Sequence, residues 1–246
     1  MPDGGEQVFW RATTRRHDWA SGDFVSRLLA AAADLGLVGP STWRRAGIAG
    51  EQEPTAGEPP AELATHLPAP GPDEPEAGVV ECGGDEPFAW SATVSVAVPG
   101  ARRPPPSTVS IWSDWEWVRR TGRASDRLAA AFAGVHSPAD TEYAFVHPYS
   151  RWLDLSAGAY RRPVTSGPTF RGVCWLTFLG PGQIEEFQAD RLGHLDGAEL
   201  RWAGGEGLLV RATRELSEAA TPAGEERLVG LTEAFRQALR PDSRWR

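Results

Sequence analysis

Alternation of apolar and polar residues predicts where this chain forms strands. The stretch FAWSATVSVAV, residues 88–98, has a period of two, which places one set of side chains on a buried face: Trp90, Ala92, Val94 and Val96. The segment TVSIW (108–112) follows the turn PGARRPPPS and predicts the second strand of a hairpin. Two further strands are predicted at 6–14 and 141–149, the second ending at Pro148.

Helical periodicity appears twice between these strands. Residues 21–37 have Ser21 as the expected N-cap, Gly36 as the expected C-cap, and one apolar stripe: Phe24, Leu28, Ala31 and Leu35. Residues 124–135 have Ser125 as the expected cap and a second stripe: Leu128, Phe132 and Val135. The order strand, helix, strand, strand, helix, strand is that of the ferredoxin-like split βαβ unit, whose two helices cover one face of an antiparallel sheet.

The C-terminal part repeats this order incompletely. A strand (173–179), a short helix (181–192) and a hairpin turning at 204–207 precede a long helix that begins after Thr221 and Pro222. We therefore predict an α+β fold with two ferredoxin-like halves, each an antiparallel sheet covered by helices. The halves are residues 1–150 and 171–246, and residues 151–170 form an irregular connection.

Residues 50–84 differ from the rest of the chain. They are rich in proline and glutamate, with seven prolines between Pro54 and Pro75. Residues 51–86 carry ten acids and no arginine, so this segment accounts for −10 and the remaining residues for +2 of the net charge of −8. Such a composition cannot repay the entropy of ordering, which predicts a long disordered insertion. It is either an inert surface loop or an acidic arm that steers a basic partner.

Composition excludes several kinds of protein. All 25 basic residues are arginine, which removes Schiff-base and phosphate-loop lysines. No apolar run reaches 18 residues and the N-terminal sequence has no signal-peptide pattern, so we expect no membrane association. Two cysteines cannot form a disulfide framework, and a cytoplasmic location is the simplest expectation.

The candidates for chemistry are weak. Cys174 lies inside a predicted strand without an identifiable activating base, which favours a core role. The turn Gly180-Pro181-Gly182 has the position of a dinucleotide-binding turn, but Glu185 replaces the third glycine and would repel a pyrophosphate. The five histidines show no metal-ligand spacing. We therefore expect no enzymatic activity, no cofactor and no metal.

The stretch WSDWEWVRR (112–120) is the candidate binding site. Tryptophan and arginine are enriched at the hot spots of protein interfaces, and the chain has 11 tryptophans. The predicted partner-binding residues are Trp112, Asp114, Trp115, Glu116 and Trp117. The alternative is that these tryptophans fill the core. Nucleic acid is not an expected partner, because the stretch balances two acids against two arginines instead of forming a basic groove.

The block RGVCWLTFLGPGQIEEF, residues 171–187, resembles a strand and turn of immunity proteins from bacterial type VI secretion and polymorphic-toxin systems. The Gly-rich hairpin GGEGLLVRAT and the terminal helix extend this resemblance over roughly 165–240. It implies a non-catalytic protein that binds and neutralises a cognate toxin, and it assigns a role to no individual residue. The toxin and the oligomeric state stay open. The alternative hypotheses are a small enzyme or ligand-binding protein on a ferredoxin-like scaffold, and a scaffold protein of a larger assembly.

Overall fold

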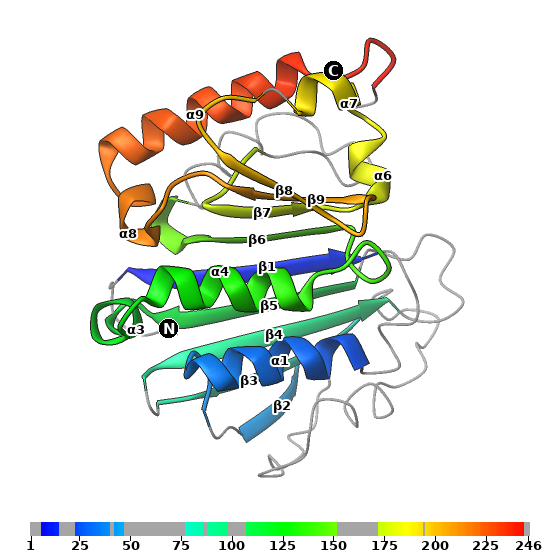
Figure 1. Cartoon of the computed structure of the whole chain (residues 1–246). Helices are drawn as coiled ribbons and strands as arrows, with labels where there is room; N and C mark the ends of the chain where they lie inside the picture. The colour runs from blue at the N-terminus through cyan, green and yellow to red at the C-terminus, as the bar shows by residue number, and fades with distance from the viewer. Residues whose placement is uncertain are drawn as a thin grey trace.

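One antiparallel sheet organises the molecule. The computed structural model describes residues 6–14, 23–39, 42–46, 77–85, 88–97, 107–151, 172–193 and 195–243. Within them, nine strands lie in the order β2-β3-β4-β5-β1-β6-β7-β9-β8, and every neighbouring pair is antiparallel (Figure 1). The strands are β1 (Gln7–Thr14), β2 (Thr42–Ala46), β3 (Ala77–Gly84), β4 (Trp90–Ala97), β5 (Ser107–Asp114), β6 (Tyr143–Pro148), β7 (Leu176–Leu179), β8 (Glu199–Ala203) and β9 (Gly207–Arg211).

Three longer helices and four short ones accompany the sheet in the described residues. The longer ones are α1 (Asp23–Leu35), α4 (Ala124–Val135) and α9 (Pro222–Gln237), and the short ones are α3 (Glu116–Arg120), α6 (Pro181–Ile184), α7 (Ala189–Leu192) and α8 (Leu216–Ala219). Figure 1 shows α1 and α4 side by side in front of strands β3 to β1, whereas α9 lies at the β8–β9 end.

The first half has the interleaved strand order of a split βαβ unit. The predicted strands β1, β4, β5 and β6 lie in the order β6-β1-β5-β4, and both predicted helices cover one face. Alternation explains which face is covered. Trp10 of β1 is buried and contacts Phe132 of α4, whereas its neighbour Phe9 belongs to a small aromatic cluster on the opposite face. The alternation predicted for β4 is confirmed, since Trp90, Ala92 and Val94 are buried.

The two-half prediction needs a correction, because the second half is not an independent sheet. β7 pairs with β6, and β9 and β8 extend the same sheet to its far edge. All four residues of β7 are buried. Pairing β7 with β6 satisfies backbone groups that β6 would otherwise leave unpaired at a buried edge. One continuous sheet is therefore more stable than two separate ones. The domain boundary near 150–171 remains a prediction, since residues 152–171 lie outside the described residues.

The predicted disordered insertion also ends earlier than expected. Residues 77–84 form β3, which pairs with β4 over its whole length and with β2 on its other side. The stretch AGVVECGG contains adjacent valines, which favour a strand, although it follows the proline-rich sequence. Residues 50–76 lie outside the described residues.

Helix ends were predicted with mixed success. Thr221 caps α9 as expected, its Oγ1 accepting a hydrogen bond from the Gly224 amide at 3.1 Å. Gly36 follows α1 with φ +75°, the left-handed conformation expected of a C-cap glycine. Ser125 does not cap α4; it is buried, and Arg123 holds the N-cap position with φ 56°. The helix predicted over 181–192 is two short helices, α6 and α7, and Ser21 lies outside the described residues.

Candidate partner-binding site

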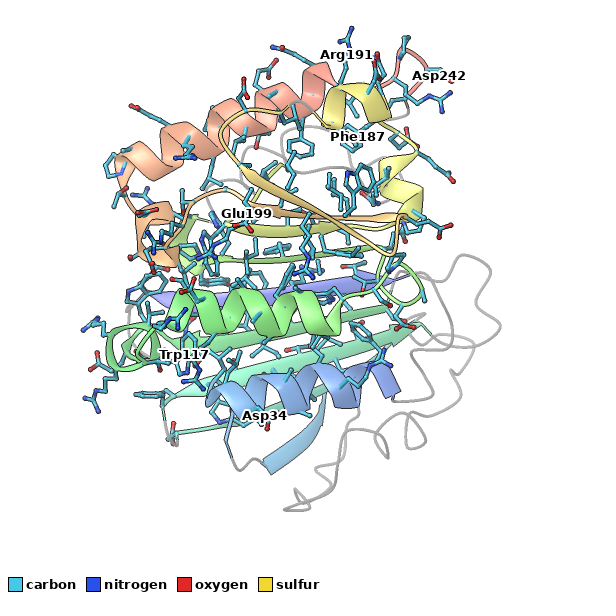
Figure 2. All side chains as sticks on the ribbon, viewed as in Figure 1. Asp34, Trp117, Phe187, Arg191, Glu199 and Asp242 are labelled. Carbon is cyan, nitrogen blue, oxygen red and sulfur yellow. The ribbon has the colours of Figure 1, made fainter. Side chains whose placement is uncertain are left out.

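The tryptophan stretch, residues 112–120, turns from a strand into a helix. β5 ends at Asp114 and α3 begins at Glu116. Trp112 in the strand and Trp117 in the helix therefore point to different layers. Trp112 is half-buried and stacks on Phe9, with ring centroids 5.0 Å apart. Trp117 is only 1% exposed, and its indole N–H donates to the Leu35 carbonyl oxygen at 2.8 Å (Figure 2). The core-filling alternative therefore describes Trp117.

The predicted acids have partners within this stretch, residues 112–120, which we call the tryptophan corner. The Asp114 carboxylate accepts from the Glu116 amide at 2.7 Å, which stabilises the turn into α3. Glu116 in turn pairs with Arg120 at 2.7 Å and with Arg119 at 3.0 Å. Trp115 is half-buried and packs against the main core. Among the predicted residues and their neighbours, the two exposed arginines therefore offer the most accessible groups to a partner.

His136 and His147 are buried, and their hydrogen bonds stabilise the fold. Trp10 donates its indole N–H to Nε2 of His136 at 3.0 Å, so the ring proton is on Nδ1, which faces the Thr141 hydroxyl. Burial lowers the pKa of His136 to about 3. Burial, reinforced by the Arg151 charge, also lowers the pKa of His147 to about 3. The hydrogen bonds described for these two rings come from backbone, tryptophan and hydroxyl groups.

The other candidates for chemistry lie in similarly closed surroundings. Burial raises the pKa of the Cys174 thiol, which leaves no thiolate at neutral pH, as the sequence led us to expect. Gly180 fits where it is because a Cβ there would lie 2.3 Å from the Thr141 carbonyl oxygen. The glycine thus serves close backbone packing. Among the described residues, no group of three or more His, Cys, Asp or Glu is placed to hold a metal ion. His17, His66 and His194 lie outside them.

A cleft at the β8–β9 end carries charges that the sequence did not single out. Its volume is about 350 Å³, and its charged walls come from α4, β8, β9, the loop after β9 and α9: Asp126, Glu199, Arg211, Arg214 and Arg227. Figure 2 shows Glu199 in the space between α4 and α9. Three arginines against two acids give this cleft a positive balance.

Arg211 is the central residue of the cleft. Its side chain is 17% exposed, and one of its amino groups, Nη2, donates to Asp126 at 3.1 Å and to the Arg214 carbonyl oxygen. The guanidinium carbon lies 5.9 Å from the centre of the buried Trp175 ring, a cation–π distance. The hydrogen bonds from Arg211, and then from Arg123, hold the pKa of Asp126 below its usual value, so the carboxylate stays charged and fixes Arg211.

The tryptophan corner and the cleft are neighbours. Arg123, the N-cap of α4 and 82% exposed, pairs with Asp126 at 3.2 Å, and Asp126 pairs with Arg211 on β9. The N-terminus of α4 thus joins α3, with its exposed Arg119 and Arg120, to the cleft. We call this surface, from α3 through the start of α4 to the cleft, the arginine end of the molecule.

Beyond the cleft, β8 forms an edge of the nine-stranded sheet. Trp202 on this strand is 43% exposed. Among the described residues, Trp202 and Val229 of α9 are the large apolar side chains exposed at the surface. An exposed tryptophan on an open strand edge is a feature of binding surfaces, because the edge offers backbone groups and the ring offers contact area.

A signal for the cleft was available in the predicted hairpin. With the turn at Gly204–Glu206, antiparallel pairing sets Glu199 opposite Arg211 and puts both side chains on one face. What the sequence could not provide was Asp126 and Arg227, which come from helices distant in the chain.

Comparison with known proteins supports the fold. The structure is similar to that of a Pseudomonas aeruginosa T6SS protein, PA0821, with a TM-score of 0.58 and 12% sequence identity, over 96% of this chain and 73% of that chain. At this identity the likeness concerns the fold. No family model matches the sequence, and no curated protein matches it. None of the described helices is long and apolar enough to cross a membrane.

Proposed function

We propose that this chain is an immunity protein that binds a cognate bacterial toxin and blocks it without catalysing a reaction. The observation that carries the proposal is the likeness of the whole fold to a protein of the type VI secretion system. The strand and turn at 171–187, which resemble those of immunity proteins, agree with it. Under this proposal the protein acts in the cytoplasm of the cell that it protects, and its partner is a protein and not a nucleic acid.

The arginine end is the surface that we propose for toxin binding. It contains the predicted residue Glu116 with the exposed arginines of α3 and α4, and it lies next to the predicted turn residues Asp114 and Trp115. Of the other two predicted residues, Trp117 is buried beneath it and Trp112 stacks on Phe9 on the opposite face of the sheet. Arg119 and Arg123 make exposed ion pairs with Glu116 and Asp126, and Arg120 pairs with Glu116 and lies over the Phe88 ring at 5.9 Å. Such pairs contribute little to folding, so these arginines can exchange their partners for acids of another protein.

Survival of a bacterial host tests the function. A candidate toxin gene, taken from those encoded next to this one, is expressed alone, with this chain, and with a double variant, Arg119→Glu together with Arg123→Glu. We expect the natural chain to restore growth and the double variant to fail, because reversed charges repel an acidic partner surface. Calorimetry on the purified proteins gives the affinity directly.

A matched control uses Arg236→Glu, a charge reversal on exposed α9 away from the arginine end. Protection by the natural chain and by this control, but not by the double variant, supports both function and surface. Equal protection by all three forms would disprove the surface and leave the function standing. No protection and no binding by the natural chain would disprove the function.

A second candidate function is ligand binding on this scaffold. The cleft around Arg211 is the observation that favours it, because the side chains of Glu199 and Arg214 on its walls make no ion pair among the described contacts.

A further inference from the structure

The cleft holds more hydrogen-bond donors than the surrounding protein uses. An arginine side chain has five N–H donors, and the side-chain hydrogen bonds that Arg211 makes within the described part of the chain involve only Nη2. Its Nε is buried and has no hydrogen-bond partner among the described residues. Since a buried donor without a partner costs free energy, its persistence in a cleft wall indicates a role outside folding. We propose that this cleft binds a carboxylate group.

Two more arginines complete the set of donors. Arg227 of α9 donates from Nε and Nη2 to the Gly197 carbonyl oxygen, at 2.9 and 2.5 Å, which leaves Nη1 available. Arg214 is exposed on the loop after β9 and makes no described side-chain bond. Two guanidinium groups can therefore reach a ligand beside Arg211. Planar arginine donors match the two oxygens of a carboxylate, and such charge-assisted bonds are about twice as strong as neutral ones.

Arg211 is held in place for this task. Asp126 on one side, the Arg214 carbonyl oxygen on the other and the Trp175 ring fix the guanidinium plane. A preorganised donor loses less side-chain entropy on binding than a free surface arginine. Asp126 and the Arg214 carbonyl oxygen both bind Nη2, so Nε–H and Nη1 of Arg211 remain as separate donors for a ligand once neighbouring surface side chains move aside.

Glu199 limits the charge of the ligand. It stands opposite Arg211 in the β8–β9 register, yet no ion pair joins the two among the described contacts. Its carboxylate and that of Asp126 repel anions, so a phosphate group, which concentrates two charges in one place, is disfavoured relative to one carboxylate group, even of a molecule that carries a second carboxylate farther away. The negative charge of Glu199 thus opposes the binding of a carboxylate ligand beside Arg211. Removing this charge should strengthen ligand binding.

The carboxylate can come from an acidic side chain of a protein or from a small organic acid, since both present the same group to the arginines. The inference goes beyond the proposed toxin binding and does not depend on it. If the toxin is the partner, the cleft would receive one of its Asp or Glu side chains.

Nuclear magnetic resonance of the whole chain tests the proposal at the atom concerned. The Nε–H signal of Arg211 is assigned by its loss in Arg211→Lys, and glutarate is added as the probe. We expect a saturable shift with a dissociation constant on the order of millimolar. Glutaramide, which lacks the charge, and sodium chloride at equal ionic strength should leave the signal in place.

Two exposed variants give opposite expectations. Arg214→Gln should weaken glutarate binding about three- to tenfold, and Glu199→Gln should strengthen it by a similar factor, as expected for one charge at close range. Arg236→Gln, far along α9, should change nothing. No saturable shift of the Arg211 signal, or equal affinities in the Arg214 and Glu199 variants, would overturn the proposal.

The source is distinguished by a second titration. A blocked peptide with one glutamate should bind about as well as glutarate if the cleft receives protein side chains. Citrate or glutarate should bind at least about tenfold more tightly than the peptide if it receives small acids. Carboxylate binding in the absence of any toxin affinity would refute the proposed function alone, whereas toxin binding without a glutarate response would refute this inference alone.

Discussion

The tryptophan corner and the β8–β9 cleft are adjacent, yet their polar groups are used differently. In the corner, Trp117 donates to a backbone carbonyl, and Asp114 and Glu116 bind neighbours in the same short segment. In the cleft, Arg211 retains an unpartnered buried Nε–H although Glu199 stands opposite in the sheet. The corner uses Trp117 and Asp114 within the fold and leaves Arg119 and Arg120 exposed, whereas the cleft also holds a buried donor without a described partner.

This difference shows why residue type alone is a poor guide to a working surface. A cluster of tryptophans and charges looks like a hot spot in sequence, but a hot spot requires groups that the fold leaves accessible. Hydrogen-bonding capacity that remains after folding is the better criterion, and only the three-dimensional arrangement reveals it.

Replacing Trp117 by alanine should break the corner and have the largest effect on stability. The ring is fully buried between α1, α3 and the sheet, so we expect a loss of about 3–5 kcal/mol in the free energy of unfolding. Urea denaturation followed by circular dichroism measures it. A loss below about 1 kcal/mol would show that the ring is not a core residue. Trp117→Phe, which keeps an aromatic ring but not the N–H donor, separates the hydrogen bond from the packing.

Acid should weaken the core before it discharges Asp126. His136 titrates near 6.5 when unfolded but near 3 when folded, so as pH falls below 6.5 the unfolded state takes up the proton first and stability decreases. One such histidine removes about 2 kcal/mol by pH 5. His147 contributes in the same direction.

The matched experiment compares unfolding free energies at pH 7 and pH 5 for the natural chain and His136→Gln. The variant should lose about 2 kcal/mol less over this interval. Asp126 has a pKa lowered from 3.8, so its pairing with Arg211 persists throughout the interval. An identical pH dependence in both proteins would contradict the buried, neutral His136.

The sequence predicted local structure well where the pattern was strong. The alternation in β4, the Gly-rich β8–β9 hairpin and the Thr221-capped α9 all occur as expected, because each depends on neighbours in the chain. The continuation of one sheet from β6 to β7 was not predictable in this way. It depends on the pairing of two edges that are distant in sequence, and periodicity carries no information about such pairing.

The same reason separates the two candidate sites. The tryptophan stretch was visible because its residues are consecutive. The cleft combines Asp126, Arg211 and Arg227, which are brought together only when α4 and α9 pack at the β8–β9 end. Ser125 illustrates the limit: it was predicted to cap its own helix, but its hydroxyl accepts from the Leu216 amide of α8 at 2.9 Å.

Removing that hydroxyl should have an intermediate effect and extend to the cleft. Ser125→Ala leaves the buried Leu216 N–H without a partner, which should cost about 1–3 kcal/mol of stability. The contact ties α8 to α4 and thereby positions the loop that carries Arg214. Glutarate affinity should therefore fall as well. Ser217→Ala, an exposed serine on the same helix, is the control. Unchanged stability and unchanged affinity would show that α8 is positioned by apolar packing alone.

Trp202→Ala should have the smallest effect on folding and thereby complete the contrast with Trp117. The ring is 43% exposed on an edge strand, so its truncation should change the free energy of unfolding by less than about 1 kcal/mol. If the edge of the sheet takes part in toxin binding, the same change should weaken that affinity by about tenfold or more, as a hot-spot tryptophan does. Calorimetry with the toxin, and urea denaturation without it, separate the two effects. Equal affinity with equal stability would confine the interface to the arginine end, and a large loss of stability would mean that Trp202 serves the fold as Trp117 does.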